Sequence, residues 1–409
     1  MKLTGKHLLV LIAMCGLIAS GVGLVTNVAG LFFTPIAEEF GILKGQASLM
    51  LTICNISFAF GGMLSPHIVS ERTLKPTLIA ATAVLALSTI ALSLCPSILP
   101  MYVLCVTRGL AAGVVGFVFV TTVLNKWFVT NIGLATSIAM GCSGLAGAVF
   151  SPIVNGIIGS MGWRTGFVAL GLLTLALNAP AIFLLPSLDP GTAGLEALGA
   201  DKASHVGEDA GKQASSAVVA ISALMFVAVL GYSLFSSALT ALPQHFPGLS
   251  EDYALGAALG ASMISLCMVT NTAGKIVLGA LIDRIGTRLS VYIYGALIGV
   301  ALVLMLLMRT PQALLVAAAL FGLSYSLATV GITMLTRDAF GLANYPKTYP
   351  TISLVGNIAN AAFSSIVGFM YDFSGGYIST LVMFLAMLIA ALGIVFFVYQ
   401  HPAQAAEEA

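Results

Sequence analysis

The sequence predicts an all-α membrane protein whose twelve transmembrane helices form two pseudo-symmetric halves of six. Three observations point to this class. The 409-residue chain is 59% hydrophobic and only 8% charged, with a mean hydropathy of +1.06, whereas soluble domains carry about 25% charged residues. It contains apolar stretches long enough to cross a bilayer, and its basic residues are shared unevenly between the loops. Composition argues against a soluble enzyme, and a net charge of +1 gives no basic surface for nucleic acid.

The apolar stretches fall into two sets of six. The N-terminal run is longer than a signal peptide, so we interpret it as a retained first span. The polar residues 187–216 are predicted to form a cytoplasmic linker between an N-terminal half, 1–186, and a C-terminal half, 217–409. The predicted spans are 8–31, 46–69, 76–95, 99–122, 132–158, 164–186, 217–242, 254–281, 289–309, 312–335, 347–371 and 378–400.

The distribution of basic residues orients these spans. With the N-terminus in the cytoplasm, eleven of the 16 Lys and Arg residues fall on the cytoplasmic side. Three, Lys44, Arg164 and Arg309, fall outside, and two, Arg108 and Lys275, lie within spans. Such a bias follows the positive-inside rule. It predicts a multi-pass protein of the inner or plasma membrane with both termini cytoplasmic.

An internal repeat relates the two halves. Glu71 and Arg72 end the second span, and Asp283 and Arg284 end the eighth span 212 residues later. Parallel repeats about an axis along the membrane normal are typical of one large transporter fold.

The loop after the eighth span carries a family resemblance. The segment from Gly279 to Arg288, G-A-L-I-D-R-I-G-T-R, resembles the loop signature G-x-x-x-D-R-x-G-R-[RK] of the major facilitator superfamily. The first-half copy is reduced to Glu71, Arg72 and Lys75. An acid at a helix end can pair with basic loop groups and latch one conformation. The resemblance implies the major facilitator fold and a gating role for Asp283, Arg284, Arg288, Glu71 and Arg72.

Two further segments narrow the resemblance. Residues 125–141, N-K-W-F-V-T-N-I-G-L-A-T-S-I-A-M-G, resemble the entry to span 5 of the monocarboxylate and oxalate–formate carriers. Residues 338–345, D-A-F-G-L-A-N-Y, resemble the segment before span 11 of the same carriers. The resemblance implies secondary transport of a small organic anion by alternating access.

Ionisable residues at membrane depth are expensive, so each is a site hypothesis. Lys275 lies near the bilayer midplane, with Asn271 one turn away on the same helix face. The pattern N-x-x-x-K-x-x-x-G resembles span 8 of those carriers, where the basic residue pairs with the substrate carboxylate and is normally Arg. The segment R-G-L-A-A-G-V-V-G from Arg108 resembles the family's span 4 pattern. It implies a structural or gating role for Arg108, with direct substrate contact as the alternative.

Polar groups within other spans are candidates to complete the pocket. Asparagine at membrane depth needs partners and usually faces the bundle interior, where it either joins helices or contacts a ligand. Tyr325 lies in F-G-L-S-Y-S, which resembles the aromatic span 10 wall of the subgroup. The candidates for substrate binding are Lys275, Asn271, Arg108, Tyr325, Asn27, Tyr232 and Asn357.

The sequence favours a monoanion such as lactate or pyruvate. Residues 351–357 of span 11 hold no cation, whereas oxalate–formate carriers have a lysine in that span. Asn271 stands where proton-coupled monocarboxylate carriers have Asp, so proton symport and exchange against a counter-anion both remain open. An oxalate–formate-like exchanger and a drug or metabolite efflux carrier are the alternatives.

No motif for catalysis or for a nucleotide is present in the sequence, so we expect a monomeric transporter without enzymatic activity, cofactor or metal. Its expected partners are the substrate anion and the lipid bilayer. The six cysteines are expected to be buried apolar side chains, and only Cys95 and Cys105 are a candidate pair for a disulfide.

Overall fold

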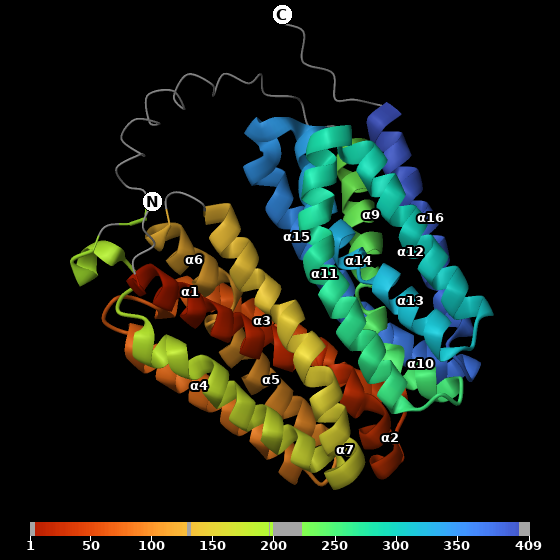
Figure 1. Ribbon diagram of the computed structural model, residues 1–409, viewed down its shortest axis with the longest axis horizontal. Coiled ribbons are helices and arrows are strands. Elements are labelled where there is room, and N and C mark those ends of the chain that lie inside the picture. Colours follow the sequence, from red (N-terminus) through yellow and green to blue (C-terminus); the bar gives the residue numbers. More distant parts are fainter. Residues whose placement is uncertain (1–4, 129–131, 196, 199–222, 401–409) are drawn as a thin grey trace, which may run out of the picture. The chain divides into compact units, whose positions relative to one another are not determined.

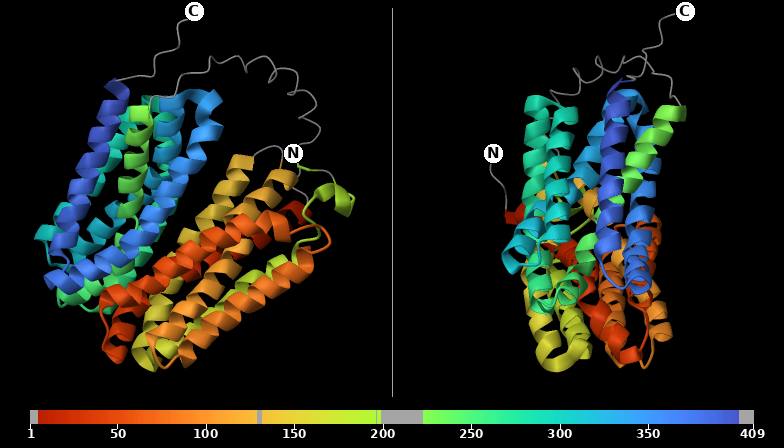
Figure 2. Two further views of the ribbon diagram at one scale, coloured as in Figure 1. Left: turned by 180° about the vertical axis from the view of Figure 1, so that it is seen from behind. Right: turned by 90° about the vertical axis from the view of Figure 1, so that its right-hand side faces the viewer.

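The computed structural model describes residues 5–128, 132–195, 197–198 and 223–400, and these residues are almost entirely helical (Figures 1 and 2). Within these ranges the only β-type pairing is an isolated bridge between Phe128 and Leu198. The predicted all-α class is confirmed. The chain divides into two compact units, residues 1–208 and 209–409. We call them the N-terminal unit and the C-terminal unit and describe each by itself.

The N-terminal unit contains the first set of predicted spans. Its first span is longer than predicted and not uniform, because the α-helix changes at Ala19 into a wider π-helical stretch, η1, that ends at Asn27. The elements are α1 (Gly5–Ile18), η1 (Ala19–Asn27), η2 (Ala29–Phe32), α2 (Phe33–Phe40), α3 (Lys44–Ile68), α4 (Leu74–Ala91), η3 (Leu92–Leu94), α5 (Ile98–Val114), α6 (Phe117–Trp127), α7 (Ile132–Leu184) and η4 (Pro190–Ala193).

The C-terminal unit contains the second set. A second π-helical stretch, η6, follows shortly after Tyr325. The elements are α9 (Ala223–Leu239), η5 (Leu242–His245), α10 (Phe246–Asp252), α11 (Ala257–Ile285), α12 (Thr287–Leu307), α13 (Pro311–Phe321), α14 (Ser324–Ser326), η6 (Leu327–Gly331), α15 (Ile332–Ser374) and α16 (Ile378–Gln400).

The described helices supply twelve crossings. Eleven helices among the described residues are long and apolar enough to cross a membrane, and one of these, Ala135–Leu184, has 50 residues. At 1.5 Å per residue it would be about 75 Å long, far beyond the roughly 30 Å hydrocarbon core of a bilayer. The helix is broken at Gly162, where φ is 82° and ψ is 162°. The two arms of α7 run in opposite directions from this point (Figure 1), so α7 contains two spans.

Glycines allow α3 and α5 to pack closely. A Cβ at Gly113 would lie against Phe58 O and 2.9 Å from Gly61 Cα, and a Cβ at Gly109 would lie against Cys54 O and 2.7 Å from Ser57 Cβ. Small residues at such contacts let helix backbones approach each other, which is the usual source of packing energy within a membrane. Gly109 and Gly113, which follow Arg108 in the sequence, therefore allow α5 to lie in close contact with α3.

Large apolar side chains are exposed on the outer faces of the helices. Phe183 is 80% exposed, Leu307 is 74% exposed and Met63 is 70% exposed. Exposure of this kind along a whole bundle is unfavourable in water, but it suits a lipid environment. Together with the length of the helices it identifies a multi-pass membrane protein.

Two sequence predictions need comment. All six cysteines are free, so the candidate Cys95–Cys105 disulfide is not formed. Residues 188–195 and 197–198 of the predicted linker pack against the N-terminal unit, where Leu198 N donates to Trp127 O at 2.9 Å. Residues 196 and 199–216 of that linker, and residues 217–222 at the start of the seventh predicted span, lie outside the described residues.

Candidate functional site

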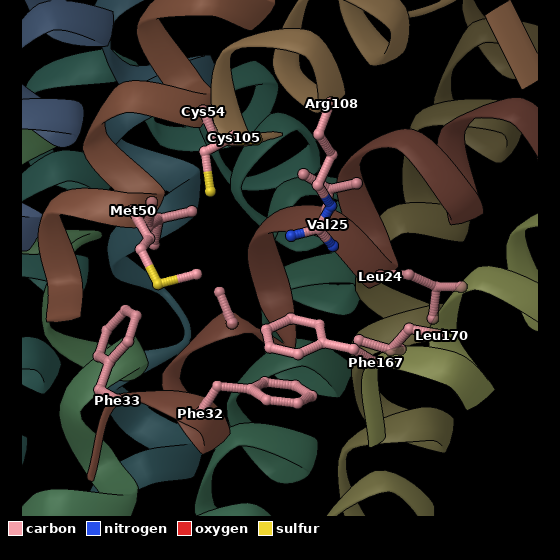
Figure 3. A pocket seen from close by; sticks show the side chains of 12 residues that line it. Leu24, Val25, Phe32, Phe33, Met50, Cys54, Cys105, Arg108, Phe167 and Leu170 are labelled. Carbon is pink, nitrogen blue, oxygen red and sulfur yellow. The ribbon is translucent and has the colours of Figure 1, made fainter. Parts of the chain in front are cut away.

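Arg108 lies on α5 and points into a pocket inside the N-terminal unit (Figure 3). Its side chain is almost fully buried, with 6% exposed. Nε has no hydrogen-bond partner, and neither of the ion pairs found among the described residues includes Arg108. A guanidinium is always charged in proteins. The pocket therefore contains an uncompensated positive charge.

The remainder of the pocket is apolar. Phe32 and Phe167 stack with ring centroids 4.1 Å apart and planes 19° apart, and Figure 3 shows the guanidinium directed toward the Phe167 side of the cavity. The side chains that share the lining with Arg108 are hydrocarbon, thioether or thiol groups: Leu24, Val25, Ala29, Phe32, Phe33, Met50, Leu51, Cys54, Cys105, Phe167 and Leu170.

Lys275 and Asn271 lie on α11 in the C-terminal unit, one turn apart as predicted. Lys275 is half-buried, and no ion pair involving it is present in the described part of the chain. Asn271 is 4% exposed. Its Nδ2 contacts Met268 Sδ at 3.8 Å, and its Oδ1 has no partner. An unpaired ammonium and an unpaired amide oxygen thus lie on neighbouring turns of one helix.

The hydrogen bonds of the C-terminal unit hold α11 and span 10 in place. Tyr294 on α12 donates to Gly274 O at 2.8 Å, one residue before Lys275. Tyr325 donates to Thr240 O at 3.2 Å. Tyr232 is fully buried and its hydroxyl has no partner. The structure therefore gives Tyr325 a helix-joining bond, whereas the Tyr232 hydroxyl is an unused polar group.

The asparagine candidates differ from one another. Asn27 Nδ2 donates to Ser143 O at 2.9 Å, so its amide joins the first span to α7. Asn357 is exposed. Asn360, three residues further along the same helix, donates to Thr240 Oγ1 at 2.7 Å.

The predicted gating residues of the C-terminal unit are exposed. Asp283 and Arg284 lie at the end of α11, and within the described ranges neither of them forms an ion pair. The guanidinium carbon of Arg288 lies 5.7 Å from the centroid of the Phe396 ring.

The Glu71 carboxylate binds backbone amides, whereas the sequence predicted a partner among basic side chains. It accepts hydrogen bonds from Leu188 N at 3.1 Å and from Asp189 N at 2.9 Å. Asp189 in turn is 3.8 Å from Lys126 Nζ. Glu71 therefore joins the end of α3 to the chain that leaves α7, while Arg72 is exposed.

A buried polar network inside the N-terminal unit was not predicted. Ser20 on η1 donates to Asn178 Oδ1 at 2.5 Å, and Asn178 Nδ2 donates to Thr82 Oγ1 at 3.1 Å. These bonds connect the first span, α4 and the second arm of α7. Asn178 lies in an apolar span of the sequence as Asn27 does, so the same signal would have marked it as a candidate.

A hollow lies at the α10–α11, α12–α13 and α15–α16 connections of the C-terminal unit, and charged side chains contribute to its lining. There the guanidinium carbon of Arg309 lies 5.1 Å from the centroid of the Tyr253 ring. Burial raises the pKa of the Tyr253 phenol, and Arg309 partly opposes the shift. Among the described residues no group of three His, Cys, Asp or Glu is placed to hold a metal ion.

The fold and these two cations within spans, Arg108 buried and Lys275 half-buried, point to one class: a multi-pass membrane transporter. The model of the Major Facilitator Superfamily matches residues 14–268 and 221–409. The chain belongs to this superfamily, whose members are transporters and not enzymes.

Similar proteins agree with this assignment. MFS-type transporter pytF of Aspergillus terreus is 26% identical over 231 residues, which cover 55% of this chain and 72% of that protein. Monocarboxylate transporter 13 of Rattus norvegicus is 20% identical over 374 residues, covering 89% of this chain and 82% of that protein. A crystal structure of the nucleoside transporter NupG has a TM-score of 0.72 at 10% identity, over 95% of this chain and 100% of that one, which shows the fold alone.

Proposed function

We propose that the protein is a secondary carrier of a small organic monocarboxylate and that Lys275 binds the carboxylate. The observation that carries this proposal is the state of Lys275, which is half-buried in a membrane-spanning helix without an ion-pair partner in the described part of the chain. A charge at membrane depth is unfavourable until it is compensated, so such a cation attracts an anion.

Asn271 supports a hydroxy acid of the lactate type, because a keto acid has no hydrogen to donate to its side-chain oxygen. Its buried Oδ1 lacks a partner, and a buried acceptor is stabilised when a donor reaches it. With the carboxylate at Lys275, a hydroxyl on the adjacent carbon is a donor of suitable reach for the neighbouring turn. The likeness to Monocarboxylate transporter 13 favours the same class of substrate.

The alternatives are oxalate–formate-like exchange and efflux of drugs or metabolites. In the oxalate–formate carriers a dianion is met by two cations, and residues 351–357 of span 11 hold no second cation to act with Lys275. Efflux of cationic drugs commonly uses a carboxylate within a span, and none occurs in the mid-span segments of this sequence. Both features favour a monoanion.

Coupling is proposed to run through Lys275. A desolvated lysine can release its proton whereas an arginine cannot, so the anion and one proton would bind together. Exchange against a counter-anion is the competing scheme. Accumulation driven by an inward proton gradient supports the first scheme, and strict dependence on internal anion supports the second.

The test is uptake of radiolabelled lactate, pyruvate, formate and oxalate into proteoliposomes. We expect uptake of the monocarboxylates, a loss of at least tenfold in Lys275→Gln and partial retention in Lys275→Arg. Lys347→Gln, which removes an exposed lysine, is the matched control and should behave as the wild type. Wild-type uptake by Lys275→Gln would refute the assignment of Lys275.

The arrangement around this site is proposed from the sequence. The two halves, 1–186 and 217–409, would expose the substrate site alternately to the two sides of an inner or plasma membrane. Residues 187–216 would form a cytoplasmic linker, and both termini would be cytoplasmic. Asp283, Arg284, Arg288, Glu71 and Arg72 would act on the rate of this exchange and not on substrate affinity. Tyr325, Tyr232, Asn27 and Asn357 would help to line the substrate path.

A further inference from the structure

The pocket around Arg108 needs an anion for electrostatic reasons. Arg108 is 6% exposed and carries a permanent charge. The described part of the chain offers it no carboxylate, and its buried Nε has no partner. Removing one partner of a buried ion pair leaves an uncompensated charge, which is strongly destabilising. A bound anion that points its charge at the guanidinium removes this penalty.

The residues that line the pocket restrict the chemistry of the rest of that anion. Apart from Arg108, the pocket presents aromatic rings, aliphatic chains, the Met50 thioether and the thiols of Cys54 and Cys105. None of these groups is a strong hydrogen-bond donor or acceptor. A ligand hydroxyl or a second charge would lose its water without finding a partner there. The lining therefore selects a single charge attached to an apolar body.

The aromatic rings in the lining favour an aromatic body. Phe32 and Phe167 form a stacked pair beside the guanidinium (Figure 3). The cavity encloses about 370 Å³ when its opening is included, and the unobstructed space within it holds about one water molecule. A larger ligand enters only if a side chain moves. Met50 has three rotatable side-chain bonds and is the lining residue best able to do so.

We infer that the Arg108 pocket is an anion-binding site of the N-terminal unit that takes the carboxylate of an apolar, preferably aromatic, monocarboxylic acid. The carboxylate pairs with Arg108 and the hydrocarbon body lies against Phe32, Phe167 and Met50. This site differs in chemistry from the one proposed at Lys275, where Asn271 favours an acid with a polar substituent. It does not depend on which substrate is transported.

Binding to the purified protein in nanodiscs tests the inference, with benzoate as the aromatic probe, lactate as the hydroxy acid and chloride as the simple anion. Benzoate should bind at least tenfold more tightly than lactate at this site, and Arg108→Gln should weaken benzoate binding at least tenfold. Arg309→Gln, which removes an exposed arginine of the other unit, should leave benzoate binding unchanged.

A second variant keeps the test informative if Arg108→Gln fails to fold. Cys105→Leu fills part of the pocket while Arg108 remains, and it should also weaken benzoate binding. Benzoate binding that survives both changes would overturn the inference. Binding of chloride without binding of benzoate would also overturn it, because the pocket would then be a halide site.

The same measurements separate this inference from the proposed function. Arg108-dependent benzoate binding in a protein that transports no monocarboxylate would leave the pocket standing and refute the carrier proposal. Lys275-dependent lactate uptake without any benzoate binding would do the reverse.

Discussion

The contact between α3 and α5 gives a prediction whose size follows from the structure. Gly113→Ala adds one methyl group at a place where the two helices are in close contact. The new Cβ would lie against Phe58 O and 2.9 Å from both Gly61 Cα and Gly62 N. All three neighbours are backbone atoms, so a side-chain rotation cannot relieve the overlap and the helices must separate.

The cost of this separation is an overpacking penalty of about 1–3 kcal/mol. Replacing a helical glycine by alanine returns about 0.5–1 kcal/mol through the backbone entropy of the unfolded chain. A net loss of up to about 2.5 kcal/mol is left, and for a unit of this size each kcal/mol lowers the melting temperature by about 2–4 °C. We therefore expect a decrease of up to about 10 °C, measured by the thermal unfolding of the detergent-solubilised protein.

Gly156→Ala is the matched control. Gly156 is also within a helix, but a Cβ there would have no heavy atom within 4 Å. This variant should be as stable as the wild type or slightly more so. If Gly113→Ala were as stable as Gly156→Ala, the close approach of α3 and α5 would be wrong, and with it the placement of Arg108.

Two further changes address stability. Gly162→Ala should lower the free energy of unfolding by about 1–3 kcal/mol, because φ is 82° at Gly162. Gly159→Ala is the control, since a Cβ there would have no heavy atom within 4 Å, and it should not lower the stability. Equal melting temperatures of the two variants would contradict the turn inside α7. Asn178→Leu removes a hydrogen-bond partner from the buried hydroxyls of Ser20 and Thr82 and should lower the free energy of unfolding by about 1–3 kcal/mol. Asn357→Leu changes an exposed residue and is the control. Similar melting curves for both variants would count against the buried network.

The spans were predictable because a bilayer imposes a simple rule. A crossing helix needs about 20 apolar residues, and this length is visible in a single sequence. The π-helical stretch that begins at Ala19 was not predictable, because the change of hydrogen-bond register depends on what the helix packs against. The same limit applies to the length of the first span, which continues through α2 to Phe40.

The candidate site was predictable in its charges but not in their surroundings. Arg108 and Lys275 stand out because so few ionisable residues occur within spans. Whether each has a partner depends on residues far away in the sequence, and only the structure shows that Arg108 lies among apolar side chains. Glu71 illustrates the opposite case, because its partners are backbone amides of Leu188 and Asp189, which leave no trace in the pattern of charges.

The hydrogen bonds of Glu71 also show that the chain remains attached to the N-terminal unit beyond the end of α7. Leu188 and Asp189 are held by that carboxylate, and Leu198 is bonded to Trp127. A designer who expresses the halves as two separate polypeptides, or inserts a reporter domain between them, should cut the chain after residue 198. A cut near residue 188 would place Asp189 and Leu198 on the other polypeptide, although both are hydrogen-bonded to the N-terminal unit.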